Sequence, residues 1–141
     1  MKIPQNDVRM VYAFDVDRTL AEPNGSRDLS SYTPISPIVN LAQSFQSFPG
    51  AAVVVTTARP ESTREVTEEW LRDNGISPVK VLMRAEGDER EDKHVRVDQI
   101  STVKEIFGCE VVLYDDKISN CQAVEFENQV PCVRVNAYGD R

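Results

Sequence analysis

The sequence predicts an α/β protein in which a doubly wound parallel sheet lies between two layers of helices. Five short apolar runs rich in valine have the length of buried parallel strands, and segments with helical spacing of apolar residues separate them. The chain has 141 residues, of which 40% are hydrophobic. A chain of this size builds one core, so we expect a single domain over residues 1–141.

The strands are recognised as apolar runs that polar or turn residues bound on both sides. They are expected at residues 10–14, 51–56, 79–83, 111–114 and 132–135. Valine is frequent in these runs, and its branched side chain suits a buried, pleated surface. Because right-handed crossovers join parallel strands, the carboxyl ends of the strands should meet at one edge of the sheet.

The helices are expected at residues 36–48, 62–74, 95–107 and 118–127. In the first helix, apolar residues recur every three or four positions, which indicates one buried face. Pro60 precedes the second helix and Gly75 follows it, and Gly108 ends the third helix in the same way. Residues 21–34, rich in Pro, Asn, Gly and Ser, and the charge-dense residues 84–94 are expected to be loops.

Charge and hydropathy limit the partners that the protein can have. The net charge of −7 argues against a surface that coats duplex DNA, because such a surface is basic, so any contact with nucleic acid should be local. The sequence has no uncharged span of membrane length and no segment typical of a signal peptide. We therefore expect a cytoplasmic protein with no membrane partner.

The three cysteines are scattered through the second half of the chain. Cys109, Cys121 and Cys132 show no CxxC spacing and no neighbouring cluster of histidines. This pattern fits a reducing compartment, with neither a zinc site nor a disulfide framework. We expect the cysteines to be core residues.

Three of the predicted strands end in polar residues that suit phosphate chemistry. Asp15 and Asp17 follow the first strand in FDVDRTL, Thr57 follows the second in VVVTTAR, and Asp115 and Asp116 end VVLYDD. Paired carboxylates can supply a nucleophile, a proton carrier and oxygen ligands for a divalent cation. Because these residues all fall at carboxyl ends of strands, the sequence predicts that they share one site.

These motifs resemble the signature of the haloacid dehalogenase (HAD) superfamily over nearly the whole chain. That signature is DxDx[TV] after the first strand, Ser or Thr after the second, a basic residue near the third helix and paired acids after the fourth. FDVDRTLAEPNGSRDLSSY, TTARPES, LMRAEGDEREDKHVR and LYDDK resemble more closely the phosphatase domain of phage polynucleotide kinase/phosphatases. No Gly-rich P-loop is present, so we expect a stand-alone phosphatase domain without the kinase half.

The resemblance implies an aspartyl-phosphate mechanism. Asp15 would attack phosphorus, while Asp17 would protonate the leaving oxygen and then activate the hydrolytic water. The cofactor would be Mg²⁺, held by Asp15, the backbone carbonyl of Asp17 and an acid of the Asp115–Asp116 pair. Which acid of that pair binds the metal directly is left open.

The resemblance also assigns the hydroxyl and basic groups of the site. Thr57 would donate its hydroxyl to a phosphoryl oxygen, with Thr56 as the competing choice. Arg96 would stabilise the charge on the phosphoryl group where the family has lysine, with Lys93 as the alternative.

Two further arginines match basic active-site positions of the polynucleotide phosphatases. Arg59 and Arg84 would bind the substrate phosphate as bidentate donors. The sequence departs from the first motif at Arg18, where the superfamily commonly has glycine.

The intervals between the motifs leave no room for a cap domain, so the expected fold is HAD-like without a sizeable cap. An open site suits a polymeric phosphoester, whereas the acidic composition favours a small one. We expect a Mg²⁺-dependent phosphatase that removes 3′-phosphates from nucleic-acid ends or nucleotides, with a separate kinase or ligase as a further partner. The alternatives are a phosphatase of small-molecule phosphoesters and a catalytically idle interaction module.

Overall fold

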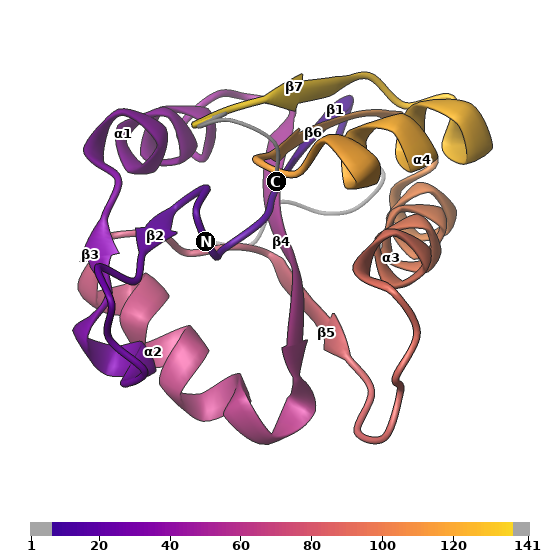
Figure 1. Cartoon of the computed structure of the whole chain (residues 1–141). Coiled ribbons are helices and arrows are strands. Elements are labelled where there is room, and N and C mark those ends of the chain that lie inside the picture. The colour runs from indigo at the N-terminus through magenta and orange to yellow at the C-terminus, as the bar shows by residue number, and fades with distance from the viewer. Residues whose placement is uncertain (1–6, 137–141) are drawn as a thin grey trace.

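A five-stranded parallel sheet forms the centre of the computed structural model, which describes residues 7–136 (Figure 1). The strand order is β5-β4-β1-β6-β7, so the chain builds outward from β1 to one edge and then to the other, as in doubly wound folds. The strands are β1 (Met10–Phe14), β4 (Ala51–Pro60), β5 (Lys80–Arg84), β6 (Glu110–Asp115) and β7 (Cys132–Arg134). All neighbouring strands of this sheet are parallel.

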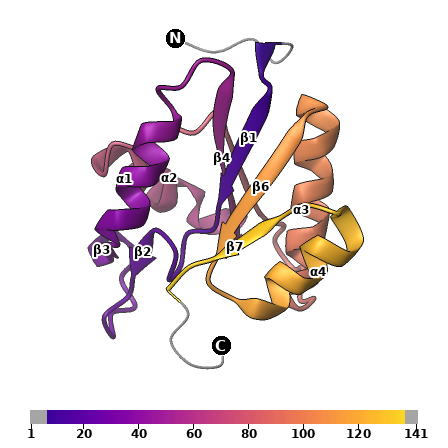
Figure 2. The ribbon, with the colours of Figure 1, turned by 90° about the horizontal axis from the view of Figure 1, so that it is seen from above.

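Two helices cover each face of the sheet, as Figure 2 shows. On one face lie α1 (Ser36–Phe45) and α2 (Arg64–Asp73), and on the other α3 (Asp92–Phe107) and α4 (Ile118–Asn128). This arrangement confirms the predicted three-layer fold. Within residues 7–136 no cap domain is inserted between the strands and helices. In the same range, no helix has both the length and the apolar character needed to span a membrane.

The alternation of side chains along the central strands creates one apolar layer on each face. Ala13 and Val54 pack in the cluster beneath α3 and α4, whereas Phe14 and Val55 pack in the cluster beneath α1 and α2. All four side chains are fully buried. Because the central strands are apolar on both faces, their sequences read as continuous hydrophobic runs.

The register of the sheet brings the predicted motifs level with one another. Phe14 pairs with Val55 on one side and with Tyr114 on the other, so the residues that follow them lie side by side. The amide of Asp15 donates to the carbonyl of Tyr114 at 3.0 Å, which extends the ladder one step beyond β1. The carboxyl ends of β1, β4 and β6 therefore form one edge, as the sequence predicted.

The element boundaries differ from the prediction in several places: β4 continues to Pro60, four residues past the predicted end, and α1 ends three residues early, at Phe45. Two further segments differ more. Residues 21–34 are not an unstructured loop, because β2 (Ala21–Glu22) pairs antiparallel with β3 (Thr33–Pro34) and a short 3-10 helix (Leu29–Ser31) lies between them. Helix α3 begins three residues earlier than expected, at Asp92, because the amides of its first turn donate to the carbonyl of Glu91.

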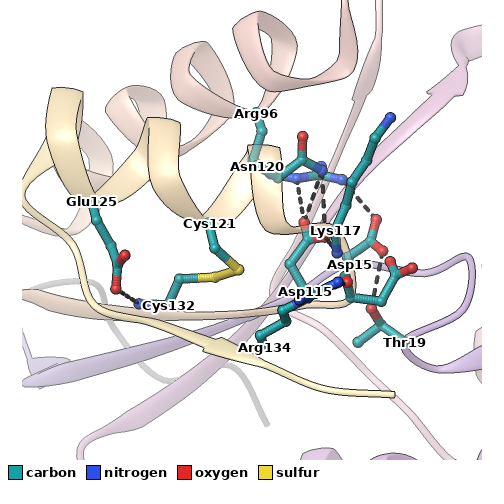
Figure 3. Close-up of a disulfide and its surroundings, with 11 residues drawn as sticks. Asp15, Thr19, Arg96, Asp115, Lys117, Asn120, Cys121, Glu125, Cys132 and Arg134 are labelled. Carbon is teal, nitrogen blue, oxygen red and sulfur yellow. Dashed lines mark hydrogen bonds and ion pairs between the residues drawn. A yellow bond between two sulfur atoms is a disulfide. The ribbon is translucent and has the colours of Figure 1, made fainter. Parts of the chain in front are cut away.

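The expectation that the protein has no disulfide is wrong in the structure. Cys121 of α4 and Cys132 of β7 form a disulfide with a Cα–Cα distance of 5.2 Å (Figure 3). Helix α4 turns back directly into β7, so two cysteines that show no motif spacing in the sequence meet in space. Cys109 remains a free thiol.

We expect the variant Cys121→Ser/Cys132→Ser to lose about 2–3 kcal/mol of unfolding free energy, because the bridge closes a short loop in the unfolded chain. Chemical denaturation without reductant measures this loss. Cys109→Ser is the matched control and should change the unfolding free energy by less than about 1 kcal/mol. If unreduced, unfolded protein reacts as three free thiols, the pairing is contradicted.

Candidate functional site

Asp15 is held at the end of β1 by two side-chain contacts. Asp15 is 6% exposed, and its carboxylate accepts a hydrogen bond from the hydroxyl of Thr19 at 3.0 Å. The other carboxylate oxygen lies 2.6 Å from Nη2 of Arg96. Figure 3 shows both contacts from the side of β7. The two contacts fix the orientation of a carboxylate that has the position expected of a nucleophile.

Arg96 lies in the second turn of α3 and is almost completely buried, with 1% of its surface exposed. Besides Asp15, its guanidinium contacts Asp115 at 3.0 Å through Nε and donates to Gln99 Oε1 at 2.6 Å through Nη1. Gln99 in turn donates to the carbonyl of Thr57. The structure thus brings Arg96, and not Lys93, to the carboxylates, because Lys93 lines a separate pocket beside α4.

The two neighbouring acids after β6 have different surroundings. Asp115 is fully buried and binds Arg96, the side-chain amide of Asn120 and the backbone amide of Lys117. Asp116 instead lines the pocket in front of Asp15. Ligand oxygens of Asp15, Asp115 and Asp116 lie within 4.8 Å of one another. We therefore assign the pocket-facing position to Asp116 and the anchoring position to Asp115.

The carboxylate cluster concentrates negative charge at the carboxyl edge of the sheet. Burial raises the pKa of Asp15 well above its ordinary value, and the neighbouring Asp115 raises it further while Arg96 lowers it. The carboxylates of Asp15 and Asp115 share the guanidinium of Arg96, and a carboxylate oxygen of Asp116 lies within 4.8 Å of theirs, so three acidic groups are concentrated at one point. An all-oxygen donor set with this charge fits a divalent cation such as Mg²⁺.

Asp17 is joined to Arg59 of β4 by a forked contact. Arg59 donates to the carboxylate of Asp17 at 2.7 Å through Nη2 and at 3.1 Å through Nε. Its Nη1 donates to Thr67 of α2 at 2.9 Å, and the guanidinium lies 5.3 Å from the ring centre of Tyr32. The predicted phosphate-binding arginine therefore orients Asp17 in the structure.

Both threonines at the end of β4 are fully buried. The hydroxyl oxygen of Thr57 accepts the backbone amide of Arg59 at 3.1 Å, which leaves its own hydrogen available to donate. The hydroxyl of Thr56 has no hydrogen-bond partner among the residues that the structure describes. Neither threonine lines the pocket, so the choice between them stays a prediction.

Arg84 lies away from the pocket and organises the loop before α3. Its donors bind the carbonyl of Ala58 at 2.9 Å, the carbonyl of Arg90 at 2.7 Å and the carboxylate of Asp92 at 2.6 Å. Asp92 lines the pocket and also contacts Lys117 at 3.2 Å. Arg84 thus fixes a pocket residue, and its predicted role in phosphate binding stays a prediction.

The pocket itself has a volume of about 310 Å³ and opens at the carboxyl edge of the sheet. Its charged lining includes Asp15, Asp17, Arg18, Asp92, Arg96, Asp116 and Lys117. Acidic groups supplied by β1 and β6 thus meet cationic groups from the loops and helices around that edge. Such a site can hold a cation and a phosphate side by side.

Three residues that sequence reasoning missed support the site through contacts from helices. Gln99 orients Arg96, Asn120 orients Asp115, and Asp92 joins Arg84 to Lys117. Asn120 lies in the first turn of the helix that follows the acidic pair, and Asp92 begins α3. Polar residues in the first turns of helices at the functional edge are the signal that could have found the last two.

The fold and the site place the chain in a recognisable class of proteins. A doubly wound sheet that ends in a DxD motif, a buried basic residue and paired acids is that of a HAD-like phosphatase domain. The family model described as the phosphatase domain of polynucleotide kinase PNKP matches residues 9–140. The chain belongs to this family. No curated protein sequence matches it.

Solved structures agree with the family. A chain of the Pnkp1/Rnl/Hen1 complex is 26% identical with a TM-score of 0.81, over 95% of this chain and 48% of that one. A chain of the Pnkp1/Rnl/Hen1 RNA repair complex is 24% identical with a TM-score of 0.78, over 91% and 42%. This chain therefore spans about half the length of these relatives.

A more distant structure shares the fold alone. UDP-GlcNAc 2-epimerase from Neisseria meningitidis bound to UDP-GlcNAc is 13% identical, with a TM-score of 0.56. The match covers 91% of this chain and 32% of that one.

We expect Asp15→Asn to raise the melting temperature in EDTA by a few degrees, because it removes a buried charge that neighbouring carboxylates repel. Calorimetry with and without the substitution measures the shift. Glu89→Gln, an exposed carboxylate with no contact found in the described chain, is the matched control and should shift the melting temperature by less than about 2 °C.

The stabilisation of the protein by Asp15→Asn should increase with pH. The pKa of Asp15 is raised in the folded state, so the folded protein holds this proton more tightly than the unfolded chain does. Below the pKa that Asp15 has in the unfolded chain, its carboxyl group is protonated in both states and costs no stability. As the pH rises from there toward the higher pKa of the folded state, the ionised carboxylate destabilises the folded protein more and more. The gain from Asp15→Asn should be larger at pH 8 than at pH 4, and a gain that is larger at pH 4 would contradict this account.

Proposed function

We propose that the protein is a Mg²⁺-dependent phosphomonoesterase that removes 3′-phosphates from nucleic-acid ends or nucleotides through an aspartyl-phosphate. One observation carries this proposal above the others. The oriented carboxylate of Asp15 stands beside Asp116 at the pocket, in a chain that belongs to the PNKP phosphatase family. An idle interaction module would not need a buried, mutually repelling set of carboxylates, which costs stability.

The proposed reaction has two displacements at phosphorus. A carboxylate oxygen of Asp15 attacks the phosphorus, and the bond to the leaving oxygen breaks as Asp17 donates its proton to that oxygen. Asp17 then takes a proton from water as the water oxygen attacks phosphorus, which breaks the bond to Asp15 and releases phosphate. Arg59 holds Asp17 in a single orientation for both proton transfers.

The remaining groups control charge and geometry. Arg96 stabilises negative charge on the carboxylate and the phosphoryl oxygens, and Gln99 and Asp115 keep its guanidinium in place. Mg²⁺ would be held by Asp15, Asp116 and the backbone carbonyl of Asp17, and would offset the repulsion between a carboxylate and a phosphate dianion. Thr57 is the proposed hydroxyl donor to a phosphoryl oxygen.

The 3′ end of a nucleic acid is supported as substrate by the family and by the open site. The pocket lies at the edge of the sheet, and no cap covers it within the described part of the chain. A small phosphoester remains the second candidate, because the net charge of −7 disfavours a long polynucleotide groove.

A partner in nucleic-acid end repair follows from the same comparison. Chains of similar structure belong to complexes with Rnl and Hen1. We propose that this domain likewise acts beside a kinase or ligase activity, supplied by a separate chain or by further sequence.

Phosphate release should be measured from a 3′-phosphorylated oligonucleotide, a 3′-mononucleotide, a 5′-mononucleotide and p-nitrophenyl phosphate, each with Mg²⁺ and with EDTA. We expect the 3′-phosphorylated oligonucleotide to be preferred and all turnover to be lost in EDTA. Asp15→Asn and Asp17→Asn should each lower kcat by at least about 1,000-fold while the far-ultraviolet circular dichroism stays native.

Glu89→Gln is again the matched carboxylate control and should retain wild-type kcat. Turnover of small esters alone would replace the 3′-end assignment with the small-molecule candidate. Substantial turnover by Asp15→Asn would contradict the mechanism for either substrate.

A further inference from the structure

Arg18 has an unusual backbone conformation beside the active site. Its φ of 64° lies in the left-handed region, which a residue with a Cβ enters only at a cost in free energy. The surrounding structure holds it there: its amide donates to the carbonyl of Ala21 at 2.7 Å, and Asn136 donates to its own carbonyl at 2.9 Å. Glycine would adopt this conformation without strain, so the presence of arginine indicates that its side chain has a function.

The side chain of Arg18 differs from the other cationic side chains that line the pocket, because no ion pair joins it to the described residues. Among the lining residues, Arg96 is paired with Asp15 and Asp115, and Lys117 contacts Asp92 at 3.2 Å. Arg18 is exposed, lines the same pocket and makes no side-chain hydrogen bond or ion pair with residues 7–136. A guanidinium at the pocket that pairs with none of residues 7–136 is available to an anionic ligand.

The position of Arg18 indicates which part of the substrate it meets. It directly follows Asp17, whose proposed task is to protonate the leaving oxygen. In an in-line displacement the leaving group departs opposite the nucleophile, so the rim beside Asp17 faces the sugar and the rest of the strand. Arg96 already contacts the nucleophile from within α3. Arg18 is therefore placed for the leaving group and not for the transferred phosphoryl group.

We propose that Arg18 binds the phosphodiester that precedes the terminal 3′-phosphate and so makes the enzyme prefer an oligonucleotide over a 3′-mononucleotide. This inference rests on the proposed function and names the substrate class of the same site. One bidentate contact at the rim allows an acidic protein to hold a strand end without an extended basic groove.

The test uses two dinucleotide 3′-phosphates that differ only in the linkage, which is a natural phosphodiester in one and an uncharged methylphosphonate in the other. Wild-type protein should prefer the charged linkage about tenfold in kcat/KM, which corresponds to about 1.4 kcal/mol. In Arg18→Ala and Arg18→Gly this preference should fall to about one, and Arg18→Lys should keep part of it. Arg72→Ala, which removes an exposed charge from α2, is the matched control and should keep the wild-type preference.

Stability gives an independent readout for the same variants. Arg18→Gly should melt a few degrees higher than wild type, because it relieves the backbone strain, whereas Arg18→Ala keeps the Cβ and should not. A higher melting temperature together with a lost preference shows that the arginine is kept for binding at the expense of stability. An unchanged linkage preference in Arg18→Ala, or an equal loss in Arg72→Ala, would overturn the inference.

Failure of the proposed function can be told apart from failure of this inference. If wild-type protein hydrolyses neither dinucleotide, the 3′-phosphatase proposal fails. Binding of the same two compounds to Asp15→Asn in Mg²⁺, measured by calorimetry, then decides the matter. A linkage preference in binding that Arg18→Ala abolishes supports the contact, and equal binding of both compounds, or of neither, overturns it.

Discussion

The buried contact of Arg96 with Asp15 and Asp115 is the interaction on which the rest of the structure depends. It joins α3 to the carboxyl ends of the two central strands β1 and β6, and its three side chains are almost completely excluded from solvent. Charges taken out of water are tolerated only when they are paired, so loss of Arg96, which would leave the carboxylates of Asp15 and Asp115 buried without this cation, should cost about 3–5 kcal/mol. Arg96 therefore stabilises the edge of the sheet and orients the carboxylate of Asp15, the proposed nucleophile, at the same time.

The same cluster of carboxylates lowers the stability of the folded protein. Burial raises the pKa of Asp15, and the neighbouring carboxylates raise it further although Arg96 lowers it. A divalent cation held by these carboxylates would lower their mutual repulsion and their repulsion of a phosphate dianion. Arg18 adds a strained backbone at the rim. Repelling carboxylates and a strained backbone are both expected of a functional site. There the surrounding fold supplies enough stability to offset the free energy that they cost.

The sequence predicted the sheet, its layers and the edge where the site lies, because valine-rich runs and the polar residues that end them are local signals. Asp15, Asp17 and the Asp115–Asp116 pair could be found in this way. Gln99 and Asn120 could not, since their importance comes from side chains that they meet only after α3 and α4 pack on the sheet. The disulfide was missed for the same reason.

The contacts of the arginines could be predicted from the sequence only in part. Arg59 and Arg84 were predicted to bind phosphate from the family resemblance and from their places after the strands, and that role stays a prediction. The structure adds contacts that the sequence did not predict, of Arg59 with Asp17 and of Arg84 with the loop before α3. Sequence position predicts the edge of the sheet at which a side chain lies. Its hydrogen-bond partner depends on the length and rotamer of the side chain in the packed structure. The distinction between Asp115 as anchor and Asp116 as pocket residue likewise needed the packed structure.

The central claim, that Asp15 is a nucleophile prepared by Arg96 and used with a divalent cation, is tested most directly by trapping the covalent intermediate. A substrate carrying ³²P in its terminal phosphate would be mixed with the protein in Mg²⁺, quenched in acid and analysed by peptide mass spectrometry. The account predicts a hydroxylamine-sensitive label on Asp15 that is absent in EDTA. Turnover without any label on Asp15, or a label on another residue, would contradict it.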